Sequence, residues 1–599
     1  MDVARKLNRV KGRSLTKTGP RQFPPPFVRE IGAVLRNDLP SLGAAGSRSA
    51  QLHRGVISAF KPLSVREQQR FAFLRWTGTL GSLLIGFGAL GAGALPVIDN
   101  PYIYYPGGNA MARMLQTSSV VAFVGVAFLV LSWVLMAPFV AVSLSQPRGG
   151  RPRASVSMLR RTFVAWTVPL ALTAPIFTQD IYSYLAQGSI VARGLDPYAG
   201  GPIDVLGSAH PLSRSVPLIW AHSPSPYGPV ALGIAAAISR LTADSIFWGV
   251  TAHRVVAVAG VAASAWTVVK LARRCGVTIE AALWLGALNP LVLLHLIGGI
   301  HNEAVLLGLL LVGCEISLRG VDAAKVSARD SGFRAQWHWL WRIIAGAALI
   351  SMAGMVKVTG FVALGFVGMA LAGALLDDPP TASRRQQARA VLYSAAIHAA
   401  VLAGSIAAVS AVTGIGLGWI TGQGGAATIR SWMSISTDTA LVFAWIGMHL
   451  GLGDHSAAML VVTRLVGLAI GGVFTLRMLW ATLRGSIHPI GGLGMSMLIL
   501  VILFPVVHPW YLLWAIVPLA AWANRPIFRV FATTYCALMS FFVLPRGLTL
   551  PAFTVLWIYG AALISFVLIA LIFWRINRVG ATGGLATRMM LREWRTRGQ

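Results

Sequence analysis

A short polar stretch between two apolar runs places several chemically capable side chains close together. The sequence TQDIYSYLAQG covers residues 178–188. If 180–193 forms a short helix, Asp180, Tyr184 and Gln187 stand at i, i+4 and i+7 on one face. Tyrosines around a carboxylate are common in sugar sites and are also common in the aromatic belts at membrane interfaces. Asp180 could equally be a helix N-cap, because Asp is favoured there, and the spacing leaves both interpretations open.

A second polar group stands where another apolar run begins. His301, Asn302 and Glu303 follow Gly298-Gly299 and precede an apolar stretch. Asn302 could cap a helix there, and Glu303 would suit its first turn. Three polar residues at a membrane boundary are nevertheless costly to desolvate, which favours a wet cavity.

Three cationic or potentially cationic side chains stand near apolar boundaries on what we expect to be the same side. They are Lys357, Arg430 and His508, the last within the sequence HPWY at 508–511. Positive residues are disfavoured on an external face, so a bound phosphate would explain them. Lys357 could alternatively extend its amine toward the headgroups.

The elements that must position these residues are membrane-spanning helices. Only 12% of the 599 residues are charged and 56% are hydrophobic, whereas about 25% charged residues is usual in globular proteins. Apolar runs of about 18–25 residues indicate an all-α, polytopic helical membrane protein and exclude a soluble enzyme and a β-barrel. We expect about fourteen spans, at 74–95, 119–144, 162–177, 245–269, 278–297, 303–318, 340–356, 358–376, 390–412, 457–476, 489–506, 510–524, 527–544 and 553–574. Two shorter segments, 228–241 and 438–452, are expected to be half-helices or interfacial helices; if both span, the count becomes about sixteen.

The arginine-rich loops predict the orientation of the chain. The loop 145–161 carries five arginines without an acidic residue, so we place it in the cytoplasm. Both termini then lie in the cytoplasm, and the loop 178–227 lies outside with a short interfacial helix. We expect a largely disordered basic tail over 1–70, a transmembrane domain over 71–575 and a second basic tail over 576–599.

Several ligand classes are not expected. The net charge is +31, but the basic residues lie in tails and short loops, so we expect membrane lipids rather than nucleic acid as partners. The predicted external loops contain no Asp-x-Asp pair, and the external histidines are scattered, so we expect no metal site and no cofactor.

Taken together, the motifs resemble a known family. The stretch 178–188, RGLDPY at 193–198, SPYGP at 225–229, HNE at 301–303 and HPWY at 508–511 are similar, in this order, to motifs of the actinobacterial α-1,6-mannopyranosyltransferases. These are GT-C-type membrane enzymes that use polyprenyl-phosphate mannose. The length and the basic N-terminal tail resemble the B-type enzymes more than the A-type.

The resemblance implies a function and a role for each candidate residue. It implies a GT-C-like transmembrane domain in the plasma membrane that extends the mannan backbone of lipomannan and lipoarabinomannan on the extracytoplasmic face. Asp180 matches the essential acidic residue of an early external loop and would act as base in an inverting displacement. Lys357, Arg430 and His508 would hold the donor phosphate. The residues expected to bind the sugars and the lipid-anchored acceptor are Tyr182, Tyr184, Gln187, Tyr227, His301, Asn302, Glu303, Trp510 and Tyr511.

Two other functions remain as alternatives. A transporter or flippase of a lipid-linked sugar would show ionisable residues near mid-membrane and paired broken helices. The second alternative is a non-catalytic assembly subunit, and inactivity of the purified protein with a lipid-linked donor would favour either alternative.

Overall fold

The protein is built almost entirely from helices. In a computed structural model, the described residues are 61–142, 152–327, 333–422, 431 and 433–572. Within these ranges, the strands are β1 (Lys61–Pro62) and β2 (Pro152–Arg153), which pair in parallel. The predicted all-α membrane architecture is therefore confirmed, while the two predicted tails lie mostly outside the described residues.

The N-terminal helices form a close-packed group. They are α3 (Val65–Ala92), η3 (Pro101–Tyr104), α4 (Gly108–Ala112), α5 (Leu115–Met136), η4 (Ala137–Val140) and α6 (Val156–Ala171). Helix α3 begins at a capping box in which Ser64 and Glu67 satisfy each other's backbone N–H groups. Helices α3 and α5 touch at glycines, because a Cβ on Gly81 would lie 2.7 Å from the Gly125 carbonyl oxygen.

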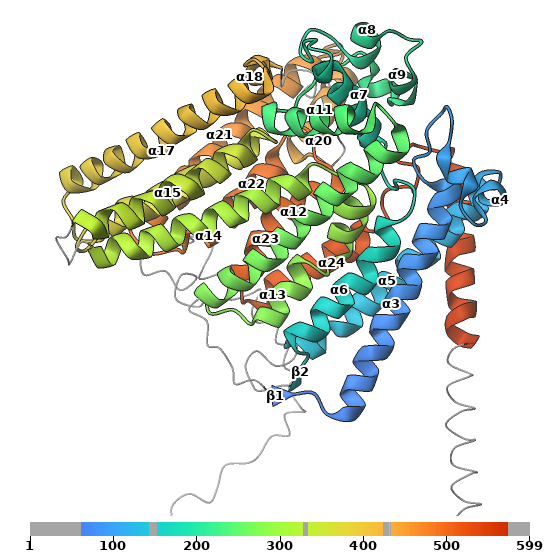
Figure 1. Cartoon of the computed structure of the whole chain (residues 1–599), viewed down its shortest axis with the longest axis horizontal. Helices are drawn as coiled ribbons and strands as arrows, with labels where there is room; N and C mark the ends of the chain where they lie inside the picture. Colours follow the sequence, from blue (N-terminus) through green and yellow to red (C-terminus); the bar gives the residue numbers. More distant parts are fainter. Residues whose placement is uncertain (1–60, 143–151, 328–332, 423–430, 432, 573–599) are drawn as a thin grey trace, which may run out of the picture.

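The predicted external loop 178–227 and the predicted short segment 228–241 fold into several short helices at one end of the molecule. They are α7 (Asp180–Ala192), α8 (Pro202–Leu206), α9 (Pro211–Ser215), α10 (Leu218–Ala221) and α11 (Pro229–Thr242). Helices α7, α8, α9 and α11 lie together at the top of Figure 1, whereas β1 and β2 lie at the bottom. The predicted short helix at 180–193 is thus present as α7.

Longer helices make up the middle of the chain. They are α12 (Ile246–Arg274), α13 (Ile279–Gly286), the π-helix η5 (Val292–Gly298), α14 (Glu303–Ser327), α15 (Phe333–Gly354), η6 (Val358–Phe361), α16 (Val362–Ala374) and α17 (Arg384–Thr413). Trp133 of α5 and Trp284 of α13 stack with ring centroids 4.6 Å apart, and each indole N–H donates to the other's carbonyl oxygen. This reciprocal contact joins the middle helices to the N-terminal group.

The C-terminal part begins with short helices and ends with a long one. Its elements are α18 (Gly418–Thr421), α20 (Ile435–His449), α21 (Ser456–Leu483), α22 (Pro489–Leu503), η7 (Pro509–Leu512), α23 (Leu513–Trp522), α24 (Pro526–Met539) and a last helix, Ala552–Ile572. The last helix packs against α5, with the rings of Phe123 and Tyr559 centred 4.7 Å apart.

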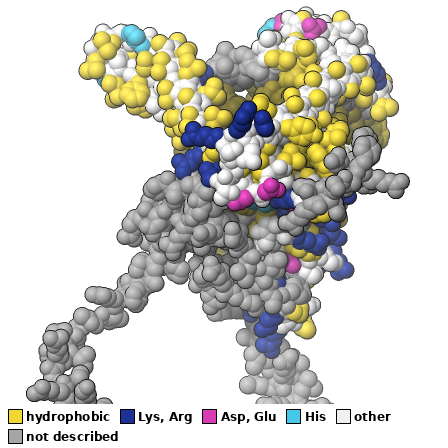
Figure 2. All heavy atoms as spheres, turned by 90° about the vertical axis from the view of Figure 1, so that its left-hand side faces the viewer, with side chains coloured by type: hydrophobic (Ala, Val, Ile, Leu, Met, Phe, Trp, Pro, Cys, Tyr) yellow, Lys and Arg dark blue, Asp and Glu magenta, His cyan; other side chains and the backbone are white. Residues whose placement is uncertain are grey.

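Length and hydropathy agree with a membrane protein. Among the described residues, seven helices are long and apolar enough to cross a bilayer, and six shorter apolar helices accompany them. On the face at the left of Figure 1, hydrophobic side chains cover the upper part, and Lys and Arg side chains gather below them (Figure 2). The two short segments are confirmed as short helices, α11 and α20, and the count of about fourteen spans stays a prediction.

Candidate active site

A cavity of about 770 Å³ collects most of the predicted site residues. It lies between the outer helices α7 and α10, the start of α14, the N-terminal half of α21 and the end of α22, and η6 and η7 complete its wall. The predicted residues on its wall are Asp180, Tyr184, Gln187, Tyr227, His301, Glu303, Lys357, His508, Trp510 and Tyr511. They come from five separate segments of the chain, so the cavity exists only in the folded molecule.

Asp180 stands at the first residue of α7 without capping it. The N-cap position is Gln179, and no side chain makes a capping hydrogen bond there. One carboxylate oxygen of Asp180 accepts from the Trp220 indole N–H at 3.2 Å, and the other lies 3.6 Å from His301 Nδ1. The capping interpretation is therefore wrong, and the carboxylate faces the cavity with 23% of its side chain exposed.

The surroundings of Asp180 raise the pKa of its carboxyl group above the value in water, so they favour the protonated, neutral form. Burial, and secondly the nearby Glu303 carboxylate, raise the pKa of Asp180 to about 6, against the lowering effect of the Trp220 hydrogen bond. A carboxyl group with such a pKa can exchange a proton near neutral pH, as a general base must.

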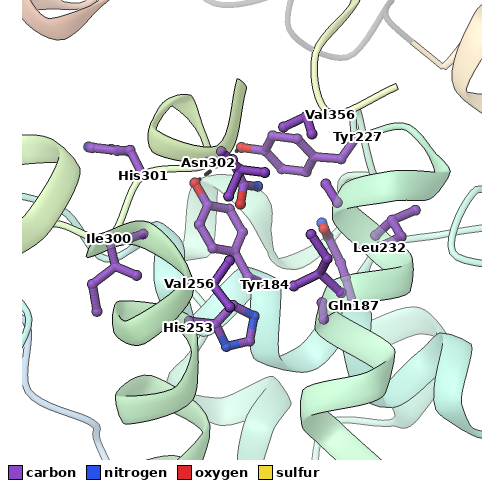
Figure 3. A pocket seen from close by; sticks show the side chains of 15 residues that line it. Tyr184, Gln187, Tyr227, Leu232, His253, Val256, Ile300, His301, Asn302 and Val356 are labelled. Carbon is purple, nitrogen blue, oxygen red and sulfur yellow. Dashed lines mark hydrogen bonds between the residues drawn. The ribbon is translucent and has the colours of Figure 1, made fainter. Parts of the chain in front are cut away.

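The predicted helical face is present. Tyr184 and Gln187 line the cavity together with Asp180. The Tyr227 hydroxyl donates to the Tyr184 hydroxyl at 3.5 Å, and Gln187 accepts from Ser225 at 3.1 Å. The two tyrosine hydroxyls point toward each other (Figure 3).

Tyr182 is not brought to the cavity. Its side chain is 1% exposed, and its hydroxyl donates to the Ala94 carbonyl oxygen on the N-terminal group of helices. A residue two positions after Asp180 is turned about 200° around the helix axis, which points it away from the site. Tyr182 therefore anchors α7 instead of contacting a ligand.

Asn302 lines a second, much smaller space. This space has a volume of about 20 Å³, enough for one water molecule. Tyr184, Gln187, Tyr227 and His301 border both spaces, and His253 borders only the small one. Figure 3 shows the Asn302 side chain beside the paired tyrosine hydroxyls.

Lys357 is held by a carboxylate and two aromatic rings. Its Nζ donates to Glu303 at 2.8 Å and lies 4.0 Å from the Tyr511 ring centroid and 4.8 Å from that of Trp514. Glu303 is 3% exposed, so the pair closes the inner wall of the cavity. The Lys357 ammonium group points toward Glu303 and the Tyr511 ring. This orientation excludes the alternative in which Lys357 extends toward the headgroups.

His508 and His301 stack on Trp510. Their ring centroids lie 4.6 Å and 4.1 Å from that of Trp510, and His295 lies 4.8 Å from it. Burial and the nearby Lys357 lower the pKa of His508 to about 4. At neutral pH, His508 is thus a neutral hydrogen-bonding group on this wall and adds no positive charge. Arg430, the third predicted cation, lies outside the described residues.

Among the wall residues that the sequence did not single out, two carry polar groups that matter for the site. Trp220, on α10, holds the Asp180 carboxylate, and Arg464, on α21, lines the cavity among apolar residues. An arginine inside the predicted span 457–476 is a signal that could have singled out Arg464, because a charge there is costly. Nothing in the local sequence connects Trp220 to Asp180.

Among the described residues, no group of three or more His, Cys, Asp and Glu side chains is placed to hold a metal ion.

Known proteins are similar in sequence to most of the chain. A family model described as alpha-(1->6)-mannopyranosyltransferase, N-terminal domain, matches residues 75–373, and one described as MptB C-terminal domain matches residues 436–571. No solved structure matches the chain.

Three curated relatives are similar over nearly their full length. Alpha-(1->6)-mannopyranosyltransferase B of Corynebacterium glutamicum is 54% identical over 573 residues, which cover 91% of this chain and 92% of that protein. A probable alpha-(1->6)-mannopyranosyltransferase of Mycolicibacterium smegmatis is 41% identical, covering 82% and 86% of the two chains. An alpha-(1->6)-mannopyranosyltransferase of Mycobacterium tuberculosis is 39% identical, covering 81% and 84%.

Proposed function

The chain belongs to the α-(1→6)-mannopyranosyltransferase family and is similar to a B-type enzyme over most of its length, and from this premise we propose a specific donor, acceptor and base. The donor is polyprenyl-phosphate mannose. The acceptor is the lipid-anchored, growing mannan backbone of lipomannan and lipoarabinomannan. The reaction takes place on the extracytoplasmic face of the plasma membrane, with both termini in the cytoplasm.

The observation that carries this proposal is the position of Asp180 on the wall of the large cavity. Its carboxylate is partly exposed there, and Trp220 orients it. Asp180 takes the proton of the acceptor 6-hydroxyl while that oxygen forms a bond to the anomeric carbon of mannose. The bond from this carbon to the phosphate oxygen breaks, and its electron pair leaves with the phosphate. Because the donor is β-linked, a single displacement inverts it to the α product.

The groups around Asp180 suit the other parts of the reaction. The Lys357 ammonium and the neutral His508 ring can donate hydrogen bonds to the oxygen charge that develops on the leaving phosphate. Tyr227 and Tyr511 offer rings and hydroxyls to the sugars. Phosphate leaves readily, so this mechanism needs neither a second acidic carboxyl group nor a metal ion.

The test is mannosyl transfer from polyprenyl-phosphate mannose to a short α-1,6-mannoside by the full chain in detergent or vesicles. We expect Asp180→Asn to lower the rate by about 10²–10⁴-fold, because a positioned base contributes that much. Donor binding and the melting temperature should stay close to those of the wild type.

The matched control is Asp204→Asn, an exposed carboxylate in the same external loop that lies outside the cavity. It should keep nearly full activity. Near-normal transfer by Asp180→Asn would remove Asp180 as base and direct attention to Glu303. Absence of transfer by the wild-type chain with any polyprenyl donor would contradict the proposed donor and favour the transporter alternative.

A further inference from the structure

The large cavity has two chemically different ends. One end carries the polar groups already described, including Asp180, His301, Glu303 and Lys357. The other is walled by α21 and α22, whose contributions are almost all apolar: Leu460, Val461, Leu465, Leu468, Leu500, Leu503 and Phe504. A ligand that fills the cavity must therefore be polar at one end and apolar at the other.

The apolar end opens sideways at α21. Val461, Leu465 and Leu468 line the cavity, yet they are 60%, 61% and 63% exposed. Exposed apolar side chains on a long apolar helix of a membrane protein face lipid. The apolar wall is thus continuous with the lipid-facing surface of α21, so a chain can enter from the bilayer without crossing water.

Arg464 stands within this apolar wall. It belongs to α21 and lines the cavity, with Leu460 one turn before it and Leu468 one turn after it. Its Nη2 donates to the Thr437 hydroxyl at 3.3 Å, and that hydroxyl in turn donates to the Pro505 carbonyl oxygen at 2.9 Å. These contacts with α20 and with the end of α22 fix the guanidinium beside the cavity.

The two cations on the cavity wall differ in what holds them. Lys357 is committed to a 2.8 Å ion pair with Glu303 and to two aromatic faces at the polar end. Arg464 lies at the apolar end and presents a planar fork of donors, which matches two oxygens of one phosphate group.

We propose that Arg464 binds the phosphate of the lipid-linked donor and that the apolar wall of α21 and α22 receives the first isoprene units of its lipid chain. This inference rests on the proposed function and adds the place where the donor's phosphate and lipid chain bind. The phosphodiester carries one negative charge, which a single guanidinium matches. When the bond to the anomeric carbon breaks, the phosphate gains a second negative charge, and Arg464 stabilises it.

The kinetic test uses Arg464→Gln and Arg464→Lys in the full chain, with Arg477→Gln as the matched control. Arg477 lies on the same helix but outside the cavity. We expect Arg464→Gln to raise the apparent KM for polyprenyl-phosphate mannose by about 10–100-fold, as loss of a hydrogen bond to a charged group does. The KM for the mannoside acceptor should change less than about twofold, and Arg464→Lys should fall between wild type and Arg464→Gln.

A binding measurement separates this inference from the proposed function. Farnesyl phosphate, farnesol, inorganic phosphate and phosphatidylglycerol are each added to the purified chain, and the shift in melting temperature is recorded. We expect farnesyl phosphate to stabilise the wild-type and Arg477→Gln chains and to lose that effect in Arg464→Gln, with little effect from farnesol or inorganic phosphate.

The outcomes distinguish the two ideas. If the wild type transfers no mannose but binds farnesyl phosphate through Arg464, the proposed function fails and this site stands. If the wild type transfers mannose and Arg464→Gln keeps both the donor KM and the farnesyl phosphate shift, this inference is overturned alone. Equal stabilisation by phosphatidylglycerol would also overturn it, because the site would then be a general lipid-headgroup site.

Discussion

At the scale of single residues, Asp180 is held in place by side chains from distant parts of the chain. Trp220 donates to one carboxylate oxygen, and His301 faces the other. Burial raises the pKa of this carboxyl to about 6. A base must be unprotonated, so transfer should fall as the pH drops through that value.

Substitution of Trp220 tests whether the pKa of Asp180 controls this pH dependence. Trp220→Phe removes a hydrogen bond to the charged carboxylate, which should raise the pKa of Asp180 and move the acidic limb of the rate profile upward by about one pH unit. The rate loss should consequently be larger at pH 6 than at pH 8. The profile of kcat against pH for the wild type and the variant measures the shift.

Trp248→Phe serves as the control, because Trp248 is 61% exposed on α12 and lies outside the cavity. Its acidic limb should coincide with that of the wild type. An unchanged limb in Trp220→Phe would mean that the indole does not tune Asp180, or that another group controls the rate at low pH.

At the scale of elements, the contact between α7 and α11 sets the position of Asp180. Gly188 of α7 lies against the backbone of α11, where an added Cβ would come within 2.5 Å of the Ala235 carbonyl oxygen. Tyr182 fastens the same helix to the N-terminal group through Ala94. A shift of α7 would move Asp180 relative to the groups on α14, η7 and Lys357.

We expect Gly188→Ala to push α7 away from α11 and lower transfer by about 10–100-fold, since a misplacement of about 1 Å at a reacting group has effects of that size. Overpacking should also cost about 1–3 kcal/mol of stability. Initial rates and the melting temperature of the purified chain measure both effects.

The comparison is Gly404→Ala on α17, where an added Cβ meets nothing within 4 Å. That variant should match the wild type in rate and melting temperature. Full activity in Gly188→Ala would show that the crossing of α7 and α11 can widen without disturbing Asp180.

At the scale of the whole molecule, residues predicted for the same side of the membrane meet in the folded chain. Asp180, His301, Lys357 and His508 lie on one cavity. Away from it, β1 pairs with β2 in the predicted cytoplasmic loop 145–161, and Arg153 forms an ion pair with Glu280 at 3.4 Å. The orientation predicted from the arginines stays a prediction, because these contacts do not say which end of the molecule faces the cytoplasm.

Thiol labelling in intact cells tests the orientation directly. All three native cysteines are buried, so labelling of the protein should come from the introduced cysteine alone. We expect Ser208→Cys, exposed in the external loop, to react fully with a membrane-impermeant reagent. Asp377→Cys, exposed between α16 and α17, should react only after permeabilisation. The reverse pattern would place the cavity on the cytoplasmic face and contradict the proposed location.

The sequence by itself determined the class of the molecule and much of its site. The shortage of charge and the apolar runs required a helical membrane protein, and the helical spacing of Asp180, Tyr184 and Gln187 placed them on one face. These features are local or compositional, so they can be derived without a fold. The resemblance of ordered motifs to the mannosyltransferases was confirmed by the relatives.

Only the tertiary structure decided which groups meet. It paired Lys357 with Glu303, stacked His301 and His508 on Trp510, and turned Tyr182 away from the cavity. It also brought Trp220 to Asp180 and Arg464 to the apolar wall. Each of these contacts joins segments separated by many residues or depends on how a helix is rotated against its neighbours. Packing between helices sets both which distant segments meet and how each helix is rotated. The periodicity within one segment therefore does not predict these contacts.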